Sequence, residues 1–172
     1  MKRLAGLCAA LLFGLAAPAM AQETDYETAL LEAVPLDAED LAEQGIVAAY
    51  NQIDPVLQSM GVDPAPLNES VDPASGRYSI DYAGRTILVA DTGMSEAEAQ
   101  GNAAALFFEI INGQLGGTGV HFYAVGHGND LVGVFLSPAA FEAARARLAP
   151  RDRPYVPDRT PPWFGMAHGP KE

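Results

Sequence analysis

Two β-hairpins, each followed by a helix, are predicted between residues 77 and 148, and this order constrains the fold more than any other feature of the sequence. The first hairpin spans residues 77–91, where apolar and polar residues alternate with the period of a half-exposed strand. Ala83-Gly84 supplies its turn. The following helix begins at Ser95, which is expected to form a capping box with Glu98. The first half of this region is therefore predicted to be a ββα unit.

The second half has the same order of elements. Residues 120–136 form a hairpin around the glycine-rich turn 126–130, and Ser137-Pro138 starts the next helix. Neither half can bury its apolar face alone, so we expect both hairpins to share one small antiparallel sheet of about four strands, with helices on one face. The predicted fold class is α+β, with a ββαββα core over residues 77–148.

An acidic segment, residues 22–76, precedes this core and is predicted to be helical and turn-rich. A short helix is expected over residues 26–34. A second helix is expected to begin after Asp37, its N-cap, and to end or kink at Pro55. Aspartate-proline pairs recur across residues 54–76 and predict turns there.

The C-terminal tail, residues 149–172, contains six prolines and is expected to be extended. Its large aromatic side chains, which include Trp163, are expected either to pin the tail to the domain or to bind a partner. We expect residues 22–172 to form one domain, because about 150 residues suffice for a single core.

The first 21 residues are predicted to be a cleavable secretory signal peptide. A basic start is followed by an apolar stretch, residues 4–17, and by Ala19-Met20-Ala21, which suits a signal peptidase that cuts after Ala21. The apolar stretch is shorter than the roughly 20 residues that span a bilayer. Cys8 would leave with the signal peptide, so the mature chain would hold no disulfide. We therefore expect a periplasmic or secreted protein with no membrane attachment after cleavage.

The mature chain is predicted to be strongly acidic. Removing Lys2 and Arg3 from 10 basic residues leaves 8 against 22 acidic residues, a net charge of −14. Such a surface repels phosphate backbones, so nucleic acid is not an expected partner, whereas cations and basic partners are favoured. The arginines of residues 145–159 are expected to lie near the acidic N-terminal segment, or simply to be solvated.

Hydrogen-bonding side chains gather around the turn of the second hairpin, and loops on rigid scaffolds often carry function. The alternative is that Asn129-Asp130 only supplies turn chemistry. The three histidines lack the local spacing typical of a zinc site, so neither a metal nor a cofactor is expected. The candidate binding residues are His121, Tyr123, His127, Asn129, Asp130 and, in the tail, Trp163.

The function predicted from these features is that of an exported, non-enzymatic binding, inhibitor or accessory module with a protein partner in the cell envelope. One alternative is a small hydrolase or lyase that uses His127 and Asp130, which requires both side chains to line a concave pocket. Another is a cation- or small-molecule-binding module built on the acidic N-terminal half. The sequence assigns neither catalytic residues nor an oligomeric state.

Overall fold

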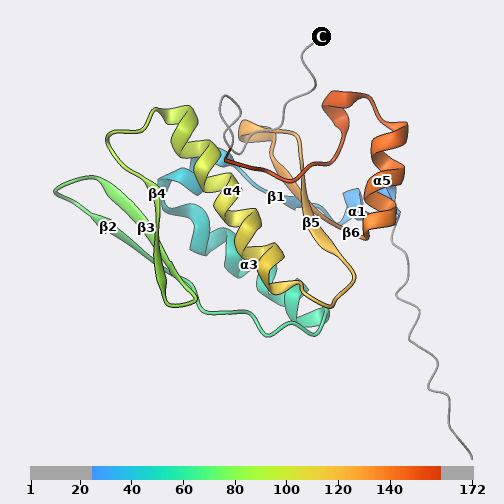
Figure 1. Cartoon of the computed structure of the whole chain (residues 1–172), viewed down its shortest axis with the longest axis horizontal. Coiled ribbons are helices and arrows are strands. Elements are labelled where there is room, and N and C mark those ends of the chain that lie inside the picture. The colour runs from blue at the N-terminus through green and yellow to red at the C-terminus, as the bar shows by residue number, and fades with distance from the viewer. Residues whose placement is uncertain (1–24, 160–172) are drawn as a thin grey trace, which may run out of the picture.

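Two separate three-stranded antiparallel sheets organise the fold, and helix α4 (Glu96–Gln114) contacts both of them (Figure 1). The computed structural model describes residues 25–159, so the predicted leader at 1–21 lies outside the described residues. The predicted α+β class is confirmed. The expectation of one shared four-stranded sheet is wrong, because each hairpin instead gains its own third strand from the N-terminal segment.

The first of these sheets has the strand order β1-β6-β5 and contains the second predicted hairpin. β5 (His121–Val125) pairs with β6 (Val132–Leu136), and β1 (Val34–Pro35) pairs with the other side of β6. Helix α1 (Tyr26–Leu31) is therefore shorter than predicted, since the chain must leave the helix before Val34 can join the sheet.

The other sheet has the order β2-β3-β4 and contains the first predicted hairpin. β3 (Arg77–Tyr82) and β4 (Arg85–Ala90) are joined by Ala83-Gly84, as predicted, and both turn residues have positive φ, at 50° and 75°. β2 (Asn68–Asp72) corrects the expectation of turns throughout residues 54–76. All five β2 side chains are exposed, so the strand carries no apolar alternation that could reveal it.

The predicted helix starts are confirmed by side-chain caps. Asp37 accepts hydrogen bonds from the next turn, Ser95 and Glu98 form the capping box, and Ser137 caps the helix that begins with Pro138. The remaining helical elements are α2 (Ala38–Asp40), the π-helical η1 (Leu41–Gly45), α3 (Ile46–Ser59), the 3₁₀ turn η2 (Gly128–Asp130), α5 (Pro138–Arg147) and the 3₁₀ turn η3 (Pro150–Asp152).

The helix expected to stop at Pro55 has a different course. The chain breaks earlier, in η1, where Gln44 has a φ of 75°, and α3 then runs through Pro55 to Ser59. Proline removes the hydrogen bond to the carbonyl of Asn51, but Asn51 is exposed, so solvent can satisfy that oxygen. The buried face of α3 holds the helix together on both sides of the proline.

Two asparagines of α4 explain why the hairpins do not meet in one sheet. The amide of Asn102 donates to the carbonyls of Leu88 and Val89 in β4, at 3.0 and 2.6 Å. The amide of Asn112 accepts from the N–H of Phe122 in β5, at 2.7 Å, and donates to its carbonyl, at 2.8 Å. These side chains occupy two carbonyls of β4 and both backbone groups of Phe122, which strand pairing between β4 and β5 would need.

The core fills the space around α4. Phe107 and Phe108 are fully buried, and Phe108 stacks on Phe122 of β5 with ring centroids 4.7 Å apart. Apolar side chains of α3, β3 and β4 join the same cluster. Within residues 25–159, no helix is both long and apolar enough to cross a bilayer.

The described part of the tail, up to Arg159, lies against the domain. Tyr155 and Ala124 of β5 exchange two backbone hydrogen bonds of 2.8 and 2.9 Å, and the Tyr155 hydroxyl donates to the carbonyl of Gly126. Arg159 forms an ion pair with Glu109 of α4 at 2.9 Å. For this stretch, pinning to the domain is what the structure shows, whereas Trp163 lies outside the described residues.

Candidate functional site

The turn of the second hairpin projects its polar side chains into solvent. His127, Asn129 and Asp130 are all exposed. Residues 128–130 form the 3₁₀ turn η2, in which the N–H of Asp130 donates to the carbonyl of His127 at 3.1 Å. This backbone hydrogen bond closes the turn.

His121 and Tyr123 do not join this turn. His121 is exposed at the start of β5, so about 13 Å of extended strand lies between it and the turn that carries His127. Tyr123 is buried and stacks on Phe141 of α5, with ring centroids 4.1 Å apart. Burial, together with the nearby carboxylate of Glu142, raises the pKa of the Tyr123 hydroxyl. Tyr123 therefore belongs to the apolar contact between β5 and α5, and the structure does not gather the predicted residues into one site.

The hydrolase or lyase alternative needs His127 and Asp130 in a concave pocket. The hollows described below are lined by other segments of the chain. Within the described range, no three His, Cys, Asp or Glu side chains are grouped so that they could hold a metal ion. Neither His127 nor Asp130 lines any of these hollows.

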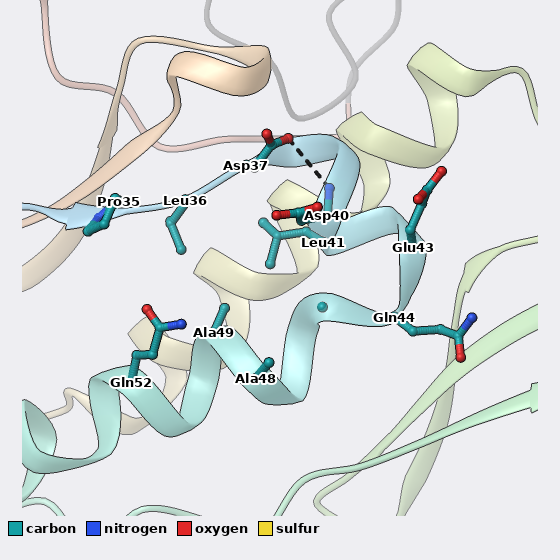
Figure 2. Close-up of a pocket in the computed structure, with 11 residues that line it drawn as sticks. Pro35, Leu36, Asp37, Asp40, Leu41, Glu43, Gln44, Ala48, Ala49 and Gln52 are labelled. Carbon is teal, nitrogen blue, oxygen red and sulfur yellow. Dashed lines mark hydrogen bonds between the residues drawn. The ribbon is translucent and has the colours of Figure 1, made fainter.

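A hollow of about 370 Å³ lies between the β1–α2 connection and α3 (Figure 2). Leu36, Leu41 and the alanines 48 and 49 form its apolar lining, and Asp40 and Gln52 add polar groups. Figure 2 shows the side chains of Glu43 and Gln44 pointing away from the hollow. Asp37 and Glu43 also border the hollow, so three carboxylates lie around it.

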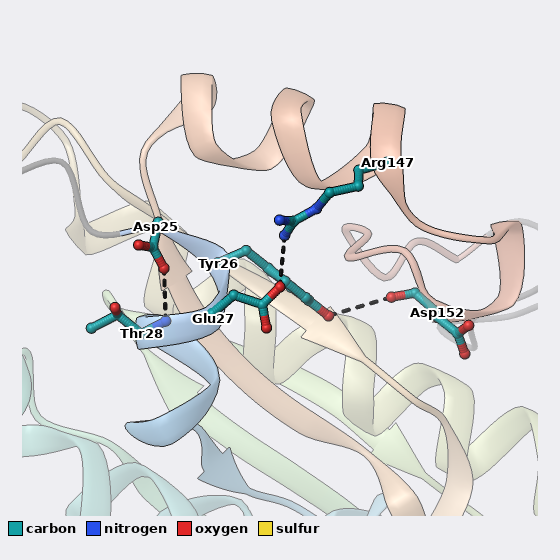
Figure 3. A network of polar contacts seen from close by, with 6 residues as sticks. All are labelled: Asp25, Tyr26, Glu27, Thr28, Arg147 and Asp152. Carbon is teal, nitrogen blue, oxygen red and sulfur yellow. Dashed lines mark hydrogen bonds and ion pairs between the residues drawn. The ribbon is translucent and has the colours of Figure 1, made fainter.

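A polar network joins α1, α5 and η3 (Figure 3). Glu27 pairs with Arg147 at 2.8 Å, and the hydroxyl of Tyr26 donates to the carbonyl of Asp152 at 3.3 Å. Asp25 caps α1 by accepting from the N–H of Thr28, and this hydrogen bond lowers the pKa of the Asp25 carboxyl. The pair Glu27–Arg147 bears out the expected approach of a C-terminal arginine to the acidic N-terminal segment.

The small hollow between α1 and α5, about 360 Å³, is lined largely by alanines of α5. A third hollow, of about 380 Å³, lies between α4 and residues 156–159 of the tail. The polar side chains around both are engaged in caps and ion pairs that hold elements together. We therefore assign them a structural role.

The outer edge of β2 is open along its whole length in the part of the chain that the structure describes. The two-residue turn makes Tyr82 and Arg85 a hydrogen-bonded pair, so the backbone of Tyr82 points toward β4. Along β3, successive residues then point their backbone N–H and carbonyl groups alternately toward β4 and toward β2. The β3 residues whose backbone points toward β2 are paired with Asn68, Ser70 and Asp72, so these three residues bond to β3. The N–H and carbonyl groups of Glu69 and Val71 therefore face outward, where β2 ends the sheet.

The other sheet edges are occupied from within the chain. β5 is covered by Asn112 and by the backbone of Tyr155, and on β4 the Asn102 amide occupies the carbonyls of Leu88 and Val89. On β1, the N–H of Leu36 donates to the carbonyl of Leu131 and so points toward β6. The backbone of the preceding residue, Pro35, therefore points away from the sheet, and proline has no N–H to donate to a further strand. Proteins commonly cover sheet edges, because an uncovered edge pairs with other chains. β2 differs from these edges because all five of its residues are exposed.

The β2 side chains on the core-facing side of the sheet have a defined arrangement. The hydroxyl of Tyr78 in β3 donates to the Glu69 carboxylate at 2.9 Å and orients it. Burial and this contact with Glu69 raise the pKa of Tyr78 far above its ordinary value, so the hydroxyl remains a donor. Val71 follows on the same face and is 37% exposed. Sequence reasoning did not select either residue, because β2 carries no alternation signal.

Searches against protein-family models, curated proteins and solved structures return no match to this chain.

Proposed function

We propose that this protein is an exported, non-enzymatic binding module that accepts an extended segment of a partner protein on the open edge of β2. The observation that supports it is that β2 is exposed along its whole length, whereas Asn112 and Tyr155 cover β5, Pro35 blocks β1, and Asn102 occupies two carbonyls of β4. Addition of a partner strand to an exposed edge is a common mode of peptide recognition, in which backbone hydrogen bonds supply affinity.

The position of β2 favours this role. Figure 1 shows the β2–β3 hairpin extending away from the helices, with β2 on its outer side. All five β2 residues are exposed, so a partner strand meets no covering segment of the described chain. The export prediction places the module in the periplasm or outside the cell, where we expect its partner in the cell envelope.

Replacing Val71 by proline tests this proposal. The N–H of Val71 faces outward, so Val71→Pro removes one donor from the open edge while the hydrogen bonds between β2 and β3 remain. Val71→Thr is the matched control, because threonine keeps the N–H and the branched shape of valine. The measurement is crosslinking and affinity capture of the full chain from its native envelope, with partners identified by mass spectrometry.

We expect a specific partner to be recovered with the wild type and with Val71→Thr, and to be lost with Val71→Pro. Thermal melts of all three proteins establish that the fold is retained. Equal recovery by a folded Val71→Pro variant would show that the partner binds elsewhere, and the proposal would then be abandoned.

The hollow beside α3 supports a second candidate, binding of a small cationic molecule or cation. Its lining combines apolar side chains with the carboxylates of Asp37, Asp40 and Glu43, which suits a ligand that carries a positive charge on an apolar body. Ligand binding raises the melting temperature by mass action. A melt that does not shift with millimolar calcium, magnesium or an alkylamine removes this candidate.

A further inference from the structure

We infer that the segment bound at β2 is an extended strand that carries a basic and an apolar residue two positions apart. This inference rests on the proposed function and adds the chemistry of the partner. It follows from which β2 side chains share a face, from their charge, and from the charge of the chain around them.

Side chains two positions apart on a strand lie on the same face. Glu69 and Val71 lie on the face that carries the buried Tyr78 and Ile80 of β3, so they form a row of one carboxylate and one methyl-bearing side chain at the sheet edge. An added strand places its own side chains directly beside this row. The complement of the row is a basic residue beside Glu69 and an apolar residue beside Val71.

The opposite face of β2 has the same sign of charge. It carries Asp72, whose pKa is lowered by hydrogen bonds from Ser75 and from the backbone of Ala74, so it is ionised at neutral pH. Arg77 lies opposite Asp72, but in β3, on the side of β2 away from an added strand. β2 itself contains Glu69 and Asp72 and no basic residue.

The chain segment that contains β2 is also acidic. Residues 22–76 contain 12 acidic residues and no Lys or Arg. A basic strand would therefore be drawn toward β2 through complementary charge, which raises association rates and disfavours acidic competitors.

A second copy of this chain is a less suitable occupant. Two-fold pairing of β2 strands could avoid placing Glu69 directly against itself, but it would bring together two acidic N-terminal segments. The charge complementarity that favours a basic peptide disfavours self-association.

Synthetic peptides test the inference with the full-length protein. One probe alternates Lys and Val on one face, with Thr on the other, and the second carries Glu in place of each Lys. Binding is measured by fluorescence anisotropy for the wild type, Glu69→Gln, Glu69→Lys and Val71→Pro. Glu69→Gln keeps an oxygen that can accept from Tyr78 and loses only the charge. Glu142→Gln on α5 makes the same change in net charge at a distance from β2.

We expect the lysine peptide to bind the wild type more tightly than the glutamate peptide, and more weakly as salt rises. Glu69→Gln should weaken lysine-peptide binding roughly two- to fivefold, the range of an exposed cross-strand ion pair. Glu69→Lys should reverse the preference between the two peptides, and Glu142→Gln should leave it unchanged.

The remaining outcomes separate the two ideas. If both peptides bind equally and Val71→Pro weakens both, strand addition stands and the basic partner is overturned. If peptide affinity is the same for the wild type and Val71→Pro, the β2 edge is not the binding site, and both proposals fail. If sedimentation shows a dimer that Val71→Pro dissociates, the occupant is a second copy, and the partner chemistry inferred here is wrong.

Discussion

Asn112 is predicted to be one of the most important polar residues for the stability of this protein. Its side chain stands in for a neighbouring strand, accepting from the N–H of Phe122 at 2.7 Å and donating to its carbonyl at 2.8 Å. Phe122 is fully buried. Asn112→Ala therefore leaves a backbone donor and a backbone acceptor without a partner next to the core.

The magnitude follows from the two groups that are left unsatisfied. Each buried polar group without a hydrogen bond costs about 1–3 kcal/mol, so the pair costs about 2–6 kcal/mol. Alanine is the better helix former and returns about 0.5 kcal/mol within α4. The expected loss is thus about 1.5–5.5 kcal/mol, a large part of the roughly 5–15 kcal/mol by which domains are stable.

Urea unfolding measures this loss, and the midpoint should fall while the dependence on urea is unchanged. Asn129→Ala is the control, because Asn129 is exposed in the hairpin turn and should cost little. If Asn112→Ala costs no more than Asn129→Ala, the amide does not close the β5 edge, and the reasoning is refuted.

A second substitution at the same site gives a pH signature. In Asn112→Asp, the ionised carboxylate can accept from Phe122 but cannot donate to its carbonyl, whereas the protonated acid can. The folded state should therefore raise the pKa of this carboxyl above about 3.9, its unfolded value. The stabilisation is fully present below the unfolded pKa and is lost as pH rises through the folded pKa. A variant whose stability relative to wild type is independent of pH would contradict this.

Three further substitutions test other local features. Gly133→Ala should destabilise by about 1–3 kcal/mol in urea unfolding, because a Cβ there would overlap the ring of Phe122. Gln44→Gly should stabilise by about 0.5–1 kcal/mol, since Gln44 has a φ of 75° and glycine adopts that region freely; an unchanged thermal melt would argue against strain there. Ser95→Ala should lower the melting temperature at neutral pH, and the deficit should shrink as pH falls through the pKa of Glu98. Hydrogen bonds from Ser95 lower the pKa of Glu98. Their contribution to stability is therefore present at pH values above the ordinary pKa of a glutamate and is lost as the pH falls through the lowered pKa of Glu98.

Local structure was predictable wherever a short stretch of sequence carries its own physical signal. The caps at Asp37, Ser95 and Ser137 were correct, because a capping side chain bonds to a backbone N–H two or three residues away. The Ala83-Gly84 turn was also correct, because glycine readily adopts the positive φ that a two-residue hairpin turn requires. By contrast, Pro55 misled the prediction, because packing on the buried face of α3 outweighs one missing hydrogen bond.

The candidate site was predictable only in part. The turn at residues 126–130 exists, but His121 and Tyr123 lie far from it or face the core, since a strand separates residues that are close in sequence. β2 was missed because exposure on both faces removes the alternation that marks a strand. An open edge is a property of the whole sheet, and it is recognised only when the partners of every other edge are known.

The fold class, the two hairpins, the helix starts and the strong negative charge follow from the amino-acid sequence, because each depends on neighbours along the chain or on composition alone. Long-range packing places the hairpins in separate sheets and leaves the edge of β2 open. Those outcomes depend on contacts such as that between Asn112 and Phe122, in which a side chain of one element satisfies the backbone of another across the core. Hydrogen bonds of this kind form only once packing has brought the two elements together.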